Sequence, residues 1–472
     1  MQTVSAFRSP PRLLTAPQPI DRLGIVTLLS SLYFLQVWGL VEPTSGLPPV
    51  FHYTMIGVSF AGILIPRRWQ VLGINAAAFT AYYLLHSPVA SNNQTTAFFF
   101  ALIVGAVYLT TVFRRPHDRN MRESVFSAIA GPARWILAGL YFYGIYHKIN
   151  ADFLDPAVSC AVVLYRTLAG HVYLEDFAFG HYGAIYATFI VEAVAMVALF
   201  IPRLKRFGMM VGLPFHIVIG FTGYAYYKDF STIVLVLYAL FLPKQAVDYG
   251  IGKIMQWAGG EKPMVWIGRM ALIAFVASYL LTSGMLWDLS KAAPTHSGFV
   301  WYFAAYSFVF YAFVMLSMHK PRDRRNEYKL NWLYIVPALF FLNGMSPYLG
   351  LKTESSMAMF SNLHTEGGQT NHLLHGRLAN TFTYQEDPLT LLRLTGPQFS
   401  ADYRPAGKTI VRYELDRLLS RNPGLIATLK ADSGPFETGA DWENTYDATN
   451  RLMQKLLIFK PVDFARPKTC TH

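Results

Sequence analysis

The sequence predicts an all-α polytopic membrane helical bundle of about ten or eleven spans, followed by a small α+β C-terminal extramembrane domain. Two observations predict this fold class. Of the 472 residues, 53% are hydrophobic and 14% are charged, whereas about 25% of the residues of an average soluble domain are charged. Many charges gather in short clusters, such as 114–115 and 322–325, between apolar runs of about 20 residues, the length that crosses a bilayer as a helix.

The apolar runs place the predicted helices in chain order. We expect spans near 23–41, 50–65, 69–86, 96–113, 124–148, 181–201, 207–222, 230–243, 264–287, 298–318 and 331–347. A shorter apolar stretch at 156–170 is expected to lie in the membrane interface. The first run is predicted to be a retained span rather than a signal peptide, because no small-residue cleavage site follows it and further spans do.

The same runs predict the domain organisation. We expect a cytoplasmic N-terminal segment at 1–22, a transmembrane domain at 23–347 and a non-cytoplasmic soluble domain at 350–472. Polar and charged residues occur throughout this last part, and its pieces at 389–394 and 409–413 are strand-like. Helices are expected at 411–430 and 441–456.

The distribution of positive charge predicts the orientation of the helices. Alternate connections, beginning with the N-terminal segment, hold 21 of the 40 Lys and Arg residues, whereas the opposite connections hold only Lys148, Arg166, Lys228 and Lys291. Cytoplasmic connections carry the excess of positive charge in membrane proteins. We therefore expect an integral membrane protein with a cytoplasmic N-terminus and an external C-terminus, in a bacterial inner membrane because no organellar signal is evident.

The net charge of +12 does not indicate nucleic acid as a partner. Its clusters are spread over short loops, they form no continuous basic face, and no nucleic-acid-binding motif accompanies them. The partner that the composition does predict is the lipid bilayer.

The two cysteines, Cys160 and Cys470, both fall on the predicted external side, where disulfides are stable. One interpretation is a bridge between them. The other is two free thiols, since spacing in sequence says nothing about the distance between their Cα atoms.

Histidines of the predicted C-terminal domain at 350–472, here called the tail, give little support for a metal site. His372 and His375 have the i, i+3 spacing that presents two imidazoles together, and His364 lies nearby with Glu354 and Glu366. No HExxH pattern or fourth close ligand accompanies them, so no metal is expected.

Ionisable residues within or beside the spans are the candidates for chemistry, because each costs several kcal/mol in a membrane. His147 and Lys148 end the fifth predicted span, Glu192 is in the middle of the sixth, His216 follows Pro214 in the seventh, and Asp229 begins the eighth. Their depths agree, so Lys148, His216 and Asp229, with Glu192, are predicted to face one outward-opening cavity. A lysine there would serve as a base.

A structural interpretation competes with this functional one. Lys148 would extend to the interface, Glu192 would form one interhelical hydrogen bond, and His216 would be a hydrogen-bonded core histidine.

Three motifs carry a family resemblance. They are LYFYGIYHKINADF at 140–153, FIPRLKRFG at 200–208 and PFH at 214–216, and the stretch 347–367 is similar to the segment that leaves the last span in bacterial members. Over roughly 20–320 the chain resembles the horizontally transferred transmembrane family, whose best-known relatives are the vitamin K-dependent gamma-carboxylases. Those enzymes share a helix that ends in a lysine-leucine pair followed by an acidic-aromatic stretch, here Lys148-Ile149 and Asp152-Phe153.

The resemblance implies a reduced, vitamin K-like quinone as cofactor. Lys148 would be the base that deprotonates it and His216 a supporting polar residue. Tyr141 and Tyr146, in the same motif, are expected to contact the cofactor. The carboxylases also have a much larger lumenal portion that binds a peptide substrate, whereas this tail is short, so the resemblance implies quinone-linked base chemistry more directly than glutamate carboxylation.

The expected function is therefore a multi-pass membrane protein with a Lys/His site for quinone-linked or carboxylase-like (carbon-carbon lyase) chemistry, acting on a peptide or protein substrate at the external side. Two alternatives remain open. One is a non-catalytic transporter or a partner subunit of a redox or secreted-peptide system. The other is a membrane anchor whose tail binds an external partner.

Overall fold

A computed structural model describes most of the chain. The described residues are 19–40, 48–89, 91–112, 121–222, 227–282, 296–319, 331–375, 381–396, 407–432, 434–439, 442–446, 450–464 and 466–470. Most of the predicted segment 1–22, the basic clusters at 114–115 and 322–325, and Lys291 lie outside them. Within the described part the protein is mostly helical, with a small antiparallel sheet near the C-terminus.

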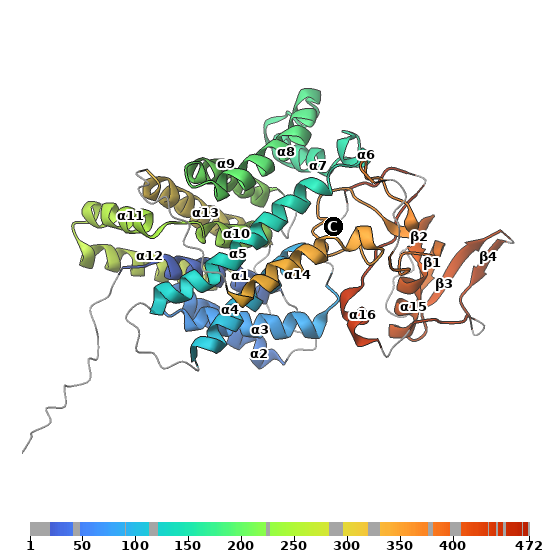
Figure 1. The fold of residues 1–472 in the computed structure, drawn as a ribbon, viewed down its shortest axis with the longest axis horizontal. Coiled ribbons are helices and arrows are strands. Elements are labelled where there is room, and N and C mark those ends of the chain that lie inside the picture. Colours follow the sequence, from blue (N-terminus) through green and yellow to red (C-terminus); the bar gives the residue numbers. More distant parts are fainter. Residues whose placement is uncertain are drawn as a thin grey trace, which may run out of the picture.

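Helices of apolar sequence make up the larger part of the molecule. They are α1 (Arg22–Leu40), α2 (Pro49–Leu64), α3 (Gln70–His86), α4 (Asn92–Val112), α5 (Met121–Tyr146), α6 (Ala151–Leu154), α7 (Cys160–Ala169), α8 (Ala178–Phe200), α9 (Lys205–Phe221), α10 (Tyr227–Ala239), α11 (Lys244–Trp257), α12 (Glu261–Thr282), α13 (His296–Ser317) and α14 (Ile335–Gly344). They lie together on one side of the molecule, and the strands lie at the other end (Figure 1).

Five described segments are long and apolar enough to cross a membrane. They are Asn92–Thr111, Met121–Tyr146, Ala178–Phe200, Glu261–Thr282 and Phe299–Ser317. At about 1.5 Å per residue, each reaches about 30 Å, the thickness of the hydrocarbon core. The described helices α2, α7 and α14 are apolar but shorter.

The predicted span at 230–243 has different bounds in the structure. α10 ends at Ala239 and α11 begins at Lys244, and the two helices are bent by 105° at the break. Pro243 immediately precedes α11 and cannot donate the backbone hydrogen bond that would continue a helix. Together the two helices are long and apolar enough to form one broken span, so the described part contains up to six candidate spans.

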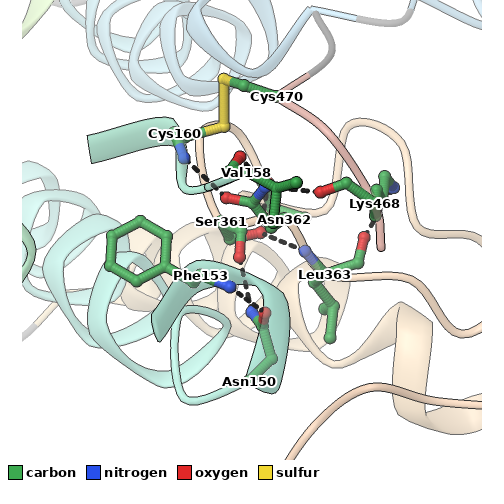
Figure 2. The surroundings of a disulfide bond; sticks show 10 residues. Asn150, Phe153, Val158, Cys160, Ser361, Asn362, Leu363, Lys468 and Cys470 are labelled. Atoms are coloured by element: carbon green, nitrogen blue, oxygen red, sulfur yellow. Dashed lines mark hydrogen bonds between the residues drawn. A yellow bond between two sulfur atoms is a disulfide. The ribbon is translucent and has the colours of Figure 1, made fainter. Parts of the chain in front are cut away.

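The predicted interfacial stretch at 156–170 contains α7, whose first residue is Cys160. A disulfide joins Cys160 to Cys470, with the two Cα atoms 4.8 Å apart (Figure 2). The interpretation with a bridge is confirmed and that with two free thiols is wrong. The bridge ties the segment 466–470 to α7.

The tail contains one antiparallel sheet. Its strands are β1 (Pro388–Thr395), β2 (Lys408–Val411), β3 (Ile426–Ala431) and β4 (Gly434–Glu437), in the order β2-β1-β3-β4. Leucines of the sheet and of α15 (Arg412–Arg421) form a small core of their own. The strand-like piece that the sequence predicts at 389–394 lies within β1. The piece predicted at 409–413 matches β2 as far as Val411, and its last two residues belong to α15.

The helix predicted over 411–430 is wrong in its second half. α15 ends at Arg421, and β3 begins five residues later at Ile426. Pro423 disfavours helical backbone in the residue before it, and Gly424 adopts a φ of 84°, which turns the chain back toward the sheet.

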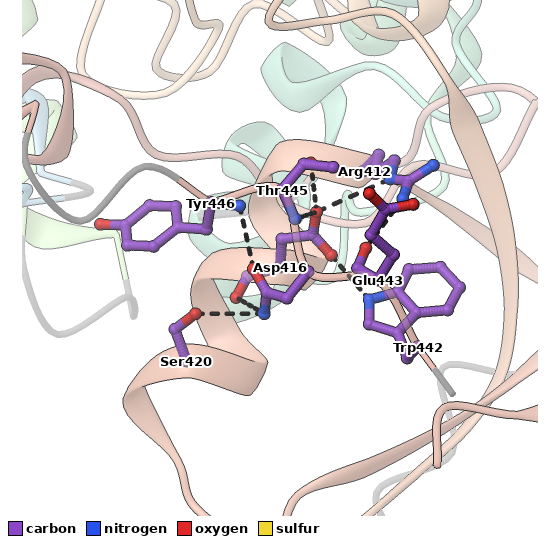
Figure 3. Close-up of polar contacts among 8 residues, drawn as sticks. Arg412, Asp416, Ser420, Trp442, Glu443, Thr445 and Tyr446 are labelled. Atoms are coloured by element: carbon purple, nitrogen blue, oxygen red, sulfur yellow. Dashed lines mark hydrogen bonds and ion pairs between the residues drawn. The ribbon is translucent and has the colours of Figure 1, made fainter. Parts of the chain in front are cut away.

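The helix predicted over 441–456 is shorter in the structure. Among the described residues of this range, only those of α16 (Arg451–Leu456) are helical. The preceding segment 442–446 is held by the buried carboxylate of Asp416 instead (Figure 3). Trp442 Nε1 donates to Asp416 Oδ1 at 2.8 Å, and the backbone N–H and hydroxyl of Thr445 donate to Oδ2 at 3.0 and 2.7 Å. These side-chain bonds replace those that a helix would supply.

Candidate functional site

The end of α5 presents a buried lysine. α5 ends at Tyr146, and the chain turns through His147 and Lys148 to Asn150, the residue that precedes α6. The Asn150 side chain accepts a hydrogen bond from Phe153 N–H at 2.8 Å, which caps α6, and donates one to the carbonyl oxygen of His147 at 2.7 Å. In this hydrogen-bonded turn, Lys148 is only 5% exposed to solvent.

Lys148 is paired with the carboxylate that lies in the middle of α8. Lys148 Nζ donates to Glu192 Oε1 at 2.7 Å, and Glu192 is buried as well. The two helices approach closely here because Gly144 has no side chain, and a Cβ atom at Gly144 would lie 3.2 Å from Glu192 Oε2. Each charge requires the other, since an unpaired charge in such a place costs several kcal/mol.

His216 belongs to a second polar group next to this pair. Its Nε2 atom is 2.9 Å from the hydroxyl of Tyr141, which is itself 2.5 Å from the hydroxyl of Tyr238 on α10. Gly212, one turn before His216 on α9, makes room for Tyr238, because a Cβ atom there would overlap its hydroxyl. Tyr141 thus joins the histidine to a buried chain of hydroxyl groups.

One pocket brings these groups together. Lys148, Glu192, His216 and Tyr141 line a cavity of about 220 Å³. A single buried water needs about 10–15 Å³ of such a volume, so the cavity has room for more than a few waters. Its other walls are mostly apolar and aromatic, from Leu140, Phe153, Leu164, Phe215, Ile219 and Phe230 among others.

Two polar atoms at the pocket remain without a hydrogen-bond partner among the described residues. They are Glu192 Oε2 and His216 Nδ1, and both are buried. Buried polar atoms of native proteins are almost always satisfied. Their presence in the walls of a cavity indicates a site for a ligand with complementary polar groups.

Residues of the tail complete the pocket. Met357, Met359 and Phe360, which follow the last predicted span, line it together with Asn92 of α4. The Asn92 side chain accepts a hydrogen bond from Met357 N–H at 2.7 Å. Sequence reasoning assigned these residues no role. The only signal was that 347–367 belongs to the family resemblance, and Asn92 and Tyr238 gave none.

Asp229 does not share this pocket, contrary to the expectation that it faces one cavity with Lys148 and His216. The described residues that line the pocket include its neighbour Phe230 but not Asp229. Successive helical residues point about 100° apart. Asp229 therefore points toward α4, where its Oδ2 atom accepts a hydrogen bond from Asn93 Nδ2 at 2.5 Å.

His147 and Tyr146 also lie outside the described pocket lining. His147 Nδ1 is 2.7 Å from the hydroxyl of Tyr348, and its Nε2 is 3.0 Å from the carbonyl oxygen of Ser356. The hydroxyl of Tyr146 contacts His375 Nε2. Both residues join the end of α5 to the chain after α14. The geometry therefore does not favour a direct contact between either residue and a ligand in the pocket.

The tail histidines take part in the same junction. His372 Nε2 donates to the carbonyl oxygen of Tyr146 at 2.9 Å, and His372 Nδ1 accepts from Leu374 N–H at 3.2 Å. Burial lowers the pKa of His372 below its usual 6.5. Among the residues that the structure describes, no group of three or more His, Cys, Asp or Glu side chains is placed to hold a metal ion.

No family model matches this chain, and neither a curated protein nor a solved structure matches it. A proposal for its function therefore depends on its own sequence and geometry.

Proposed function

We propose that this protein is a multi-pass membrane protein of the horizontally transferred transmembrane type, with about ten or eleven spans. We propose further that it holds a reduced quinone-like ligand next to Lys148 and uses this lysine as a base. One observation carries the proposal. The buried Lys148–Glu192 pair and His216 lie in the wall of a mostly apolar pocket, within a helical bundle of membrane-spanning character.

The free polar atoms of the pocket favour the reduced form of such a ligand. Glu192 Oε2 accepts hydrogen bonds, and His216 Nδ1 accepts one when its other nitrogen carries the proton. A reduced quinone has hydroxyl groups that donate, whereas an oxidised quinone has only acceptors. The aromatic rings of Phe153 and Phe230 provide apolar contact for the ring of the ligand.

The residues of the chain account for the movement of one proton. Transfer from Lys148 Nζ along the 2.7 Å hydrogen bond to Glu192 Oε1 leaves a neutral amine. A neutral amine is the form that accepts a proton from a ligand hydroxyl. His216, held by Tyr141, orients the ligand, and the apolar walls keep bulk water away. When bound, a reduced quinone would supply the acidic hydroxyl.

We propose an external location for the tail, in a bacterial inner membrane. The asymmetry of Lys and Arg supports this orientation. The Cys160–Cys470 disulfide supports it independently, because disulfides persist on the oxidising side of a membrane.

The second candidate is a transporter, and the break between α10 and α11 favours it. Broken helices line the binding sites of many transporters. If the protein is a transporter, substrate should cross the membrane of vesicles that contain it at a rate that does not depend on a basic amine at position 148.

Ligand titration of the purified protein in detergent tests the proposed function. The probes are a short-chain naphthoquinone and its reduced form, kept reduced under argon. We expect saturable binding, at least tenfold tighter for the reduced form, read out by quenching of tryptophan fluorescence. Equal affinity for both forms, or no saturable binding, would contradict the proposal.

A further inference from the structure

One wall of the pocket is a loop of the tail. Residues 355–363 contact the start of α4, the turn after α5 and the start of α7. Met357, Met359 and Phe360 of this loop line the pocket. Met357 and Phe360 are buried, at 3% and 8% exposure. The loop therefore forms one wall of the pocket.

Four residues of this loop hold a backbone conformation that L-amino acids rarely adopt. Ser355, Met357, Phe360 and Asn362 have φ angles of 58°, 67°, 59° and 54°. Asparagine tolerates this left-handed region, but serine, methionine and phenylalanine do so at a cost in free energy. Such conformations persist only where the surrounding structure fixes them, and they cluster at ligand clamps and switch regions.

The side chain of Asn362 is one fixing point (Figure 2). Its Oδ1 atom accepts a hydrogen bond from Cys160 N–H at 2.9 Å. Its Nδ2 atom donates to the carbonyl oxygens of Val158 and Lys468, at 3.0 and 2.6 Å. The loop is therefore tied both to the start of α7 and to the C-terminal segment.

The C-terminal segment 466–470 is the second fixing point. Lys468 Nζ donates to the carbonyl oxygen of Leu363 at 2.6 Å, and Lys468 N–H donates to Asp152 Oδ2 of α6 at 2.9 Å. Two residues further on, Cys470 is bonded covalently to Cys160. The segment thus passes over the loop and is fastened beyond it.

We propose that residues 355–363 form a lid over the pocket, and that the C-terminal segment is a strap which the Cys160–Cys470 disulfide holds across this lid. The strained backbone of the lid favours opening, and the strap opposes it. Release of the strap opens the pocket to water-soluble molecules on the tail side. The proposal concerns the pocket itself and requires neither a quinone nor catalysis.

Thiol accessibility tests the lid directly. Thr188 of α8 lines the pocket, and a Thr188→Cys variant is compared in two backgrounds, the native disulfide and Cys160→Ser/Cys470→Ser. The probe is a permanently charged methanethiosulfonate reagent, which does not partition into lipid or detergent. We expect labelling at least tenfold faster in the background without the disulfide. Equal rates would overturn the proposal.

Hydrogen–deuterium exchange gives a second readout that needs no added cysteine. Peptides covering 355–363 are expected to exchange at least tenfold faster after Cys160→Ser/Cys470→Ser, or after reduction of the purified wild-type protein with a phosphine. If the double variant does not fold, exchange in the reduced wild-type protein still tests the proposal. The matched control is Asp416→Asn, which loosens 442–446 elsewhere in the tail and is expected to leave the lid unchanged. Unchanged lid exchange after reduction would also overturn the proposal.

Discussion

At the scale of single residues, the Lys148–Glu192 pair dominates the site. Both side chains are nearly inaccessible to solvent, and Nζ and Oε1 are 2.7 Å apart. Burial removes the hydration of both charges, and only their mutual attraction offsets that loss. The pair therefore contributes little net stability, but either partner alone is costly.

The first prediction follows from this asymmetry. Lys148→Met is expected to destabilise the protein by about 3–5 kcal/mol, because it leaves the carboxylate of Glu192 buried and unpaired. The double variant Lys148→Met/Glu192→Gln removes both charges and is expected to recover most of the loss. Thermal unfolding in detergent measures both. A double variant no more stable than the single one would contradict the pairing.

Gly144 leads to a second prediction. A Cβ atom there would lie 3.2 Å from Glu192 Oε2, so Gly144→Ala is expected to displace the carboxylate and weaken binding of a reduced quinone at least tenfold. The control is Gly183→Ala, because Gly183 of α8 has no atom within 4 Å of its added Cβ. Equal affinities in the two variants would show that the carboxylate position does not matter.

At the scale of elements, hydrophobicity predicted most helices but not their ends. The long run at 124–148 corresponds to α5, because 26 consecutive helical residues leave a strong signal. The break at Pro243 and the turn at Pro423-Gly424 depend on individual residues, so window-averaged patterns missed both. Segment 442–446 depends on long-range bonds to Asp416, which no local pattern reveals.

The junction between α5 and the tail is a short antiparallel contact. Leu373 N–H donates to the carbonyl oxygen of Ile149 at 2.9 Å, and Ala151 N–H donates to that of Asn371 at 3.1 Å. His372, between these bonds, uses both ring nitrogens as a neutral imidazole. His375, Tyr146 and Tyr348 face its ring, with centroids 5.1, 4.9 and 5.5 Å away.

The third prediction concerns the pH dependence of this junction. Burial lowers the pKa of His372 below 6.5. The segment 371–375 therefore takes up a proton more readily when it is released from the end of α5 than when it is docked there. Docking is therefore expected to be complete above pH 6.5 and to weaken as pH falls below it. Exchange of the 371–375 amides, corrected for intrinsic rates, measures this. His372→Gln should abolish the pH dependence, and a variant with unchanged dependence would contradict the assignment.

At the scale of the whole molecule, the tail forms part of the pocket between the helices. The sequence predicted a separate domain after Gly350, and the sheet does have its own core. Residues 355–363 nevertheless pack against helices and line the pocket. A boundary read from composition misses this, because the polarity of a segment does not reveal what its few apolar residues contact.

The orientation of the whole chain provides the fourth prediction. Charge asymmetry and the disulfide both favour an external tail. In a bacterial host, alkaline phosphatase fused after residue 472 is expected to be active, and a green fluorescent protein fused there is expected to be dark. The opposite pair of results would contradict the topology.

The candidate site was predictable only in part. Residue type and depth singled out Lys148, Glu192 and His216, and the structure brings these three together. The same reasoning included Asp229, because depth along a helix does not fix the direction in which a side chain points. The contribution of Tyr238 depends on packing between distant segments and left no local pattern. That of Phe360 was marked only by its place in the stretch 347–367.

The most direct test of the central claim is a binding titration with a reduced short-chain naphthoquinone, on wild type and three variants at matched folding. Lys148→Ala and His216→Ala remove groups in the pocket wall, whereas Asp229→Asn changes a buried carboxyl group at similar depth outside it. We expect saturable binding by the wild type and by Asp229→Asn, and its loss in the other two. No binding by the wild type, or equal loss in all three variants, would contradict the account.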